Sequence, residues 1–400
     1  MTNTASTSPS KASIFQAPGM LALLGIVGLG FANFSLLLPA TPTWAHQGGA
    51  SESQTGAVTL ILMVATILTQ TQVNRFLAKL GWGKSFALAL LFLTLPAALQ
   101  AVSPVIWLVM LTSALRGVGF GLLTVCGSTA ITRLVPTHQY GKAVGAYGLV
   151  IAGPQFVLSS AAPAVVDALG ARAVLLASTL SLVGLFLTSR VGGVLDSLAL
   201  ADQQGEADTP GKAGGTFVLI WASLLGLFLV TATGGALLTF APQIALTPAL
   251  ATGSLLMLTG LAAPARWLMG SLSDRMNLNL LILIQGLMTA VGTALLGYSV
   301  VTGGSALWIL LGSALLGIAY GGLQSVTMVK AFADAGKKRT AQASVFWNIT
   351  FDAGTGAGSM ILGVLAQSFG FSTALYLMAA AALLATLISV ARGVTLAGQK

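Results

Sequence analysis

The sequence predicts an all-α membrane protein with twelve transmembrane helices in two pseudo-symmetric six-helix halves. Of its 400 residues, 56% are hydrophobic and only 7% are charged, whereas a soluble domain carries about 25% charged residues. The apolar residues form long runs, and a helix needs ~20 residues to cross ~30 Å of hydrocarbon. The segments 113–125 and 313–326 match almost without gaps at an offset of 200 residues, which indicates two related halves.

The predicted spans follow one another with short loops. They lie at about 19–40, 55–76, 84–101, 104–132, 143–166, 171–190, 216–241, 250–273, 278–301, 305–330, 341–367 and 370–392. Such runs are too long and too uniformly apolar for barrel strands, which alternate over ~10 residues. The two halves are therefore expected at 19–190 and 216–392.

Three polar segments lie outside the predicted spans. We expect residues 1–18 to be a disordered cytoplasmic tail and 393–400 to be a second tail. The segment 191–215 contains four acids and ends in Gly and Pro residues. It is interpreted as a flexible cytoplasmic linker between the halves, with solvated acids.

Basic residues fix the predicted orientation. With the N-terminus inside, every Lys and Arg except Arg116, Arg172 and Arg266 falls in a cytoplasmic segment, as the positive-inside rule requires. Arg266 is within snorkelling reach of the same side. The net charge of +9 therefore indicates topology and not a nucleic-acid partner. We expect a monomer in the lipid bilayer of a bacterial cytoplasmic membrane, with both termini in the cytoplasm.

The composition argues against an enzyme, a cofactor and a metal site. The single cysteine, Cys126, excludes a disulfide framework or thiolate cluster and is expected to be a packing residue. The chain has nine acids and two histidines, with no cluster at ligand spacing and no phosphate-binding loop. A channel is disfavoured because a two-half repeat suits alternating access.

Two ionisable residues lie deep in predicted spans. Arg116 is in the fourth span and Asp352 in the eleventh, where a charged group costs about 2.5–3.5 kcal/mol on insertion scales. Leu316 stands at the repeat position equivalent to Arg116, so packing alone does not require the arginine. Arg116 could serve coupling, substrate binding or structure. Asp352 could bind a proton or cation, or could pair permanently with Arg116.

A candidate substrate cavity follows from polar and aromatic residues in spans that typically face the interior. Each of these residues could instead form a hydrogen bond between helices. The set is Asn33, Gln70, Gln155, Gln243, Tyr320, Gln324, Trp347, Asn348 and Phe351.

Two loops resemble a signature of the major facilitator superfamily. The loop after the eighth predicted span reads Gly270-Ser-Leu-Ser-Asp274-Arg275 and is similar to the family's Gly-x-x-x-Asp-Arg-x-Gly-Arg-Arg. The first-half loop keeps Lys79 and Gly81 but has Asn74 and Ala78 in place of the glycine and the acid. The resemblance implies a conformational latch that holds the outward-open state. Its degenerate first copy could instead only set topology.

Other motifs resemble the superfamily's bacterial drug and metabolite proton-antiport efflux permeases. They are Arg116 with the glycines that follow it, the Gly153-Pro154 step, and Phe351-Asp352 with its spaced glycines. A Gly-Pro step bends a helix, so Gly153 and Pro154 are expected to form a pliable gate or a simple kink.

The resemblance implies a secondary transporter. It would export a drug-like compound or metabolite by proton-coupled alternating access, with Asp352 and Arg116 in the coupling. The alternative is a proton-coupled uptake symporter of a sugar or organic acid, in which Arg116 would bind a substrate carboxylate.

Overall fold

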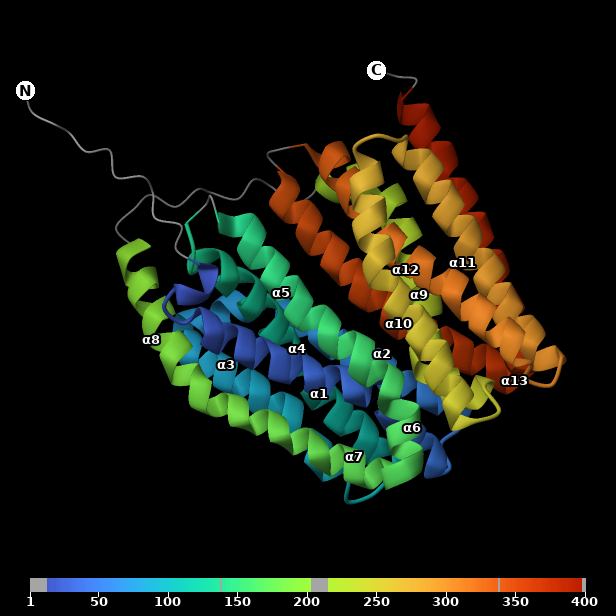
Figure 1. Cartoon of the computed structure of the whole chain (residues 1–400), viewed down its shortest axis with the longest axis horizontal. Coiled ribbons are helices and arrows are strands. Elements are labelled where there is room, and N and C mark those ends of the chain that lie inside the picture. The colour runs from blue at the N-terminus through green and yellow to red at the C-terminus, as the bar shows by residue number, and fades with distance from the viewer. Residues whose placement is uncertain (1–12, 137–138, 203–214, 337–338, 398–400) are drawn as a thin grey trace, which may run out of the picture.

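The computed structural model describes residues 13–136, 139–202, 215–336 and 339–397, and in these ranges every regular element is a helix (Figure 1). The helices of the first half are η1 (Ile14–Gln16), α1 (Met20–Gln47), α2 (Glu52–Gln70), α3 (Val73–Gln100), α4 (Ile106–Arg133), α5 (Tyr140–Pro154), η3 (Gln155–Ser159), α6 (Ser160–Leu169), α7 (Ala171–Ala177), η4 (Ser178–Gly184) and α8 (Leu185–Asp202). Those of the second half are α9 (Thr216–Ile244), α10 (Pro248–Ser273), α11 (Leu278–Val301), α12 (Ala306–Ala335) and α13 (Thr340–Ala397).

The described helices account for the predicted spans. Eleven helical stretches are long and apolar enough to cross a membrane, and the last of them, Gln342–Ala391, has 50 residues. Its helix breaks at Gly370, where φ is 78°, because a positive φ is accessible to glycine at little steric cost. The two arms of α13 therefore correspond to the last two predicted spans, as Figure 1 shows at its red end.

The first half extends beyond its predicted boundary. Helix α8 continues to Asp202, so the start of the predicted 191–215 linker is helical, while residues 203–214 lie outside the described residues. Asp196 lies in this extension, and its Oδ1 accepts from the backbone N–H of Trp82 at 2.9 Å. The expectation that this acid is solvated was wrong. Gly81 (φ 72°) breaks α3 directly before Trp82, which leaves that N–H free for the carboxylate.

The internal repeat appears as equivalent helix contacts in the two halves. Gly117 and Gly121 of α4 face the backbone carbonyls of Leu62 and Thr66 in α2. Gly317 and Gly321 of α12 face the carbonyls of Leu258 and Ala262 in α10 in the same way. Small residues thus let α4 meet α2, and α12 meet α10, at backbone distance.

The two ends of the bundle differ in charge. Exposed basic residues gather at the end where α2 passes into α3, α4 into α5, and α10 into α11; this is called the basic end below. Its exposed basic residues include Arg75, Lys79, Lys84, Arg133, Lys142 and Arg275. The other end, where α1 passes into α2 and α9 into α10, is called the opposite end.

Replacing Gly117 with Leu should destabilise the bundle, because a side chain there would overlap the carbonyl of Leu62. Overpacking of a close-packed interior costs about 1–3 kcal/mol, so the midpoint temperature of unfolding in detergent should fall. Gly145→Leu is the matched control, since nothing lies within 4 Å of a Cβ at Gly145. Equal melting of the two variants would contradict this packing.

Candidate substrate cavity

A cavity of about 170 Å³ lies between the halves. Helices α1, α2, α4 and α5 of the first half line it, together with α9, α10, α12 and α13 of the second. Its lining residues are Phe31, Phe34, Leu38, Met63, Gln70, Phe120, Thr124, Ile151, Gln155, Leu238, Arg266, Tyr320, Gln324, Trp347, Asn348, Phe351, Asp352 and Thr355. A cavity between halves is where this kind of helical repeat places a substrate.

Aromatic rings form walls on both sides of the cavity. In the first half, Phe34 stacks on Phe120 with ring centroids 3.7 Å apart. In the second half, Trp347 stacks on Phe351 at 5.8 Å, and Phe351 meets the edge of Tyr320 at 6.1 Å. The cavity therefore offers flat apolar surfaces of the kind that hold aromatic or aliphatic groups.

The cavity opens toward the basic end. A second cavity of about 470 Å³ shares five of its lining residues, Gln70 and Asn348 among them. It extends to Asn74, Ser128 and Ser344, which lie where α2, α4 and α13 reach the basic end. The two cavities therefore adjoin each other, and the second lies between the first and the basic end.

Contacts between α2 and α13 close the opposite end. Gly56 faces the carbonyl of Ser359, and Gly363 faces the carbonyl of Glu52, both too closely to admit a side chain. Thr239 of α9 joins this contact, because its hydroxyl lies 3.0 Å from that of Thr59 and 2.8 Å from that of Ser359.

Helices α6 and α10 close the opposite end on its other side. The hydroxyls of Ser160 and Thr259 lie 2.8 Å apart, and the backbone N–H of Ala164 donates to Thr252 Oγ1 at 3.2 Å. Both bonds join the first half to the second. The opposite end is therefore sealed by two pairs of helices.

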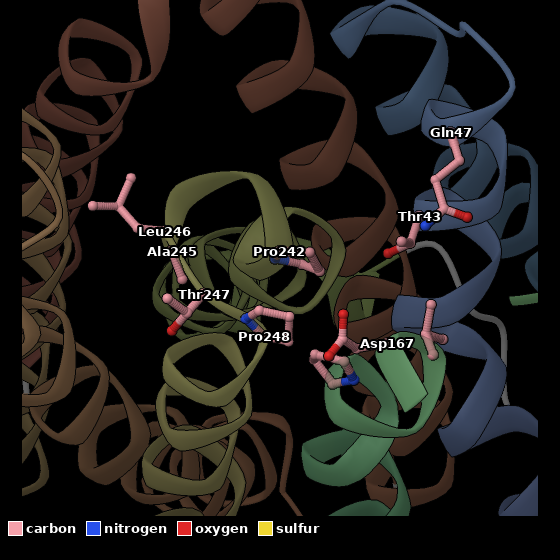
Figure 2. A pocket seen from close by; sticks show the side chains of 10 residues that line it. Thr43, Gln47, Asp167, Pro242, Ala245, Leu246, Thr247 and Pro248 are labelled. Atoms are coloured by element: carbon pink, nitrogen blue, oxygen red, sulfur yellow. The ribbon is translucent and has the colours of Figure 1, made fainter. Parts of the chain in front are cut away.

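Figure 2 shows one of the pockets at the closed end. It has a volume of about 150 Å³ and lies between Thr43 and Gln47 of α1, Asp167 of α6 and the 245–248 turn before α10. Asp167 is the only charged residue among its described lining residues. This pocket shares no described lining residue with the central cavity.

Asp352 connects the two halves inside the cavity. Its side chain is 7% exposed, and its Oδ2 accepts from Gln70 Nε2 at 2.9 Å. Gln70 is the last residue of α2, so the helix that seals the opposite end also carries this bond. Among the described residues that line the cavity, Asp352 is the only acid.

The glycines after Asp352 bring helices together. Gly354 and Gly358 face the backbone of α9, at Phe228 and Ala232. A Cβ at Gly356 would lie 2.8 Å from the Cβ of Met63 in α2. The glycines therefore let α13 lie against both halves at once.

Arg116 lies outside the cavity lining and does not pair with Asp352. It is fully buried about ten residues, or ~15 Å, into α4. Its Nη1 donates to Thr41 Oγ1 of α1 at 2.9 Å. Its Nε and Nη2 have no hydrogen-bond partner in the described part of the chain. The equivalent Leu316 is also fully buried.

Arg266 is a cavity residue that the sequence did not reveal. Its guanidinium donates to Gln324 Oε1 of α12, and both side chains line the cavity. The sequence placed Arg266 at the membrane surface because it is close to the end of its span. The sequence did contain one signal for a role in the cavity, because Arg266 is a charged residue within a predicted span.

Most of the predicted substrate-binding residues do line the cavity: Gln70, Gln155, Tyr320, Gln324, Trp347, Asn348 and Phe351. Asn33 does not, because its amide donates to Ser178 O and Ser181 Oγ, each at 3.1 Å, inside the first half. Gln243 lines a pocket at the opposite end with His46 and Glu52. Phe31, Phe34 and Phe120 were missed, although Phe31 and Phe34 are spaced to share one helix face.

The predicted latch residues lie at the basic end. Asp274 ends α10, and both it and Arg275 are exposed. A Cβ at Gly270 would have only Ser325 Oγ within 4 Å, at a distance of 3.9 Å. In the first half Lys79 is exposed, and Gly81 lies against Asp196 of α8.

The predicted gate is a change of helix type. Helix α5 ends at Pro154, and Gln155–Ser159 form a π-helical turn, η3, before α6. Pro154 has no N–H for the carbonyl four residues earlier, and π-turns often mark functional sites. Phe156 of this turn reaches Gly260 of α10, 2.8 Å from where a Cβ would be. The turn therefore lies at the contact between the halves.

Comparisons with known proteins agree with this architecture. The family model of the Major Facilitator Superfamily matches residues 23–359. No curated protein matches the sequence.

Solved structures of transporters share the fold. A bacterial homologue of the human lysosomal transporter Spinster, in an inward-facing and unoccupied conformation, has a TM-score of 0.67 and 17% identity, with 96% of each chain covered. The xylose transporter XylE from E. coli, in a partially occluded inward-open conformation, has a TM-score of 0.70 and 15% identity, covering 94% of this chain and 96% of its own. A POT family transporter in complex with a thioalcohol-conjugated peptide has a TM-score of 0.73 and 12% identity, covering 94% and 96%.

Asp196→Ala should lower the stability of the first half, because it leaves the Trp82 N–H without its acceptor. Loss of a comparable helix cap costs about 0.5–2 kcal/mol, which a thermal unfolding curve in detergent would record. Asp274→Ala is the control, since Asp274 is exposed at the end of its helix and should melt like the wild type. An unchanged midpoint for Asp196→Ala would show that the carboxylate does not hold α3 to α8.

Proposed function

This chain belongs to the Major Facilitator Superfamily, and we propose that it exports a small organic compound, drug-like or a metabolite, by proton-coupled alternating access. Membership of this transporter family makes it an integral membrane transporter and not an enzyme. We further propose that it acts as a monomer in the bacterial cytoplasmic membrane, with both termini in the cytoplasm. The exposed basic residues at one end support this orientation.

The observation that carries the proposal is the environment of Asp352. Its partner is the neutral amide of Gln70 and not a basic side chain, so no fixed positive charge holds the carboxylate ionised. A group in this setting can exchange a proton with the cavity. Acidic residues inside membrane helix bundles commonly serve as proton carriers in transporters.

Coupling follows from competition at one carboxylate. Ionised Asp352 can bind a cationic group of the substrate and accept from Gln70. Protonated Asp352 has no charge and a weaker bond to Gln70, since hydrogen bonds to charged groups are the stronger ones. The proton and the substrate then cannot occupy Asp352 together, which is the requirement for antiport.

Alternating access would exchange which end of the bundle is sealed. The cavity is open at the basic end and closed at the opposite end, so this conformation would load substrate from the cytoplasm. Release outside requires α2 to part from α13 and α6 to part from α10. The Gly153-Pro154 step at the end of α5, with the π-helical turn that follows it, is proposed as the gate. The proposed latch at the basic end consists of Gly270, Asp274, Arg275, Lys79 and Gly81.

Arg116 is proposed as the second ionisable group of the cycle. Two of its donor atoms have no partner in the described part of the chain, and its one bond joins α4 to α1 through Thr41. Movement at the opposite end would change what these donors meet.

Asp352→Asn should abolish coupled transport, because asparagine can neither bind nor release a proton there. The measurement uses everted membrane vesicles, in which substrate entry is followed together with proton release. The control is Asp167→Asn, which changes an acid at the opposite end that does not line the central cavity and should leave coupling intact.

The same assay distinguishes the alternative. Proton release with wild-type coupling in Asp352→Asn would rule out Asp352 as the proton carrier. Accumulation of a sugar or organic acid by intact cells under an inward proton gradient would instead support an uptake symporter on this fold.

A disulfide across the opposite end should stop transport. The hydroxyls of Ser160 and Thr259 lie 2.8 Å apart, so sulfur atoms at these positions are within reach of a bond of ~2.05 Å. Oxidation of Ser160→Cys/Thr259→Cys should lock the halves together and abolish transport, and reduction should restore it. Each single variant is a control that should remain active. Full activity in the cross-linked protein would contradict alternating access by separation of α6 from α10.

A further inference from the structure

Arg266 is an exposed basic residue of α10 that lines the central cavity and has no acidic partner in the described part of the chain. It precedes the end of α10 at Ser273 by seven residues, or ~10 Å of helix. Its guanidinium donates to the neutral Gln324, and Ser325 Oγ donates to its backbone carbonyl at 2.8 Å. No carboxylate of the described residues lies within 4.0 Å of the Arg266 guanidinium. The ion pair found in the described part of the chain joins Lys330 to Asp334 instead.

This charge faces the space that a substrate would occupy. Arg266 and Gln324 both line the central cavity. A guanidinium has five N–H donors in a fixed fork, and Gln324 Oε1 is the acceptor found for them among the described residues. A purely structural arginine in a membrane bundle is normally paired with an acid or with backbone carbonyls.

The cavity is therefore polar at two separate points. Arg266 is its only basic residue and Asp352 its only acid among the described lining residues. They come from different helices, α10 and α13, and both line the cavity together with Tyr320. The same lining includes the stacked rings of Trp347 and Phe351 on the side of the second half.

We propose that Arg266, held by Gln324, binds a carboxylate of the transported compound. The guanidinium fork matches a carboxylate in shape and charge and can donate two parallel hydrogen bonds to it. The aromatic walls hold the apolar or aromatic body of the same molecule, and any amino group that it carries can reach toward Asp352. The substrate class that fits both charges is thus a zwitterion with an aromatic or apolar body, whose carboxylate binds Arg266 and whose amino group binds Asp352. This inference rests on one part of the proposed function, namely that the central cavity is the site where the transported compound binds.

The test is a binding measurement with matched probes. Purified protein in detergent is titrated by calorimetry with 3-phenylpropionate, indole-3-acetate and phenylalanine. Each is compared with its uncharged or amine twin: 3-phenylpropanol, indole-3-ethanol and phenethylamine. At least one carboxylate should bind about tenfold or more tightly than its twin, as expected for hydrogen bonds to a charged group.

Variants test whether the tighter binding of the carboxylate probes depends on the Arg266 side chain. Arg266→Gln should remove it, so that acid and twin bind alike, while Arg266→Lys should keep most of it. Arg190→Gln changes an exposed arginine of α8 that does not line the cavity and should behave as the wild type. If Arg266→Gln does not fold, Gln324→Glu serves instead, because a carboxylate beside the guanidinium would occupy it and should abolish the preference.

Two results would overturn the proposal. One is that no carboxylate in the panel binds more tightly than its twin. The other is that folded Arg266→Gln or Gln324→Glu keeps the wild-type preference. The calorimetric titration uses no proton gradient and therefore tests substrate binding alone. The vesicle experiment with Asp352→Asn tests the direction and coupling of transport. A negative result in one experiment can thus be distinguished from a negative result in the other.

Discussion

The pairing of α2 with α13 is the contact on which the rest of this structure depends. At the start of α2, Gly56 lies against Ser359, and the two helices meet at backbone distance. At its last residue, Gln70 donates to Asp352. One rigid helix thus connects the seal at the opposite end with the only acid among the described lining residues of the cavity. Under the proposed function, a change in the charge of Asp352 would act on the helix pair that has to separate when the opposite end opens.

Asp352, Arg266 and Arg116 have different environments, and these suggest different tasks. Asp352 has a neutral partner from the other half, which suits a group that changes protonation during transport. Arg266 has a neutral partner from its own half, which leaves its charge available to a ligand. Arg116 is sealed between α4 and α1, away from the cavity. Polar atoms in hydrocarbon need partners, so the partners present indicate which of these groups can respond to a substrate or a proton.

Much of the fold could be predicted from the sequence, because span length, the repeat and the position of Asp352 are properties of the chain order alone. Which side of a helix faces the cavity depends instead on how the helices pack, and the sequence order does not determine it. Asn33 was placed in the cavity because it is polar, yet its rotation about α1 turns it to Ser178. Phe31 and Phe120 resemble lipid-facing residues until the halves are brought together. Asp196 was assigned to a linker because only the folded first half brings it to Trp82.

We propose that the charge of Asp352 controls which end of the bundle is open. Distances between spin labels on the two halves test it most directly, with one pair at Lys84 and Met276 for the basic end and another at Val102 and Val301 for the opposite end. The account predicts that a change between acidic and alkaline pH shifts both distance distributions in opposite directions in the wild type. In Asp352→Asn the distributions should stay fixed. The same pH response in both proteins would contradict the account.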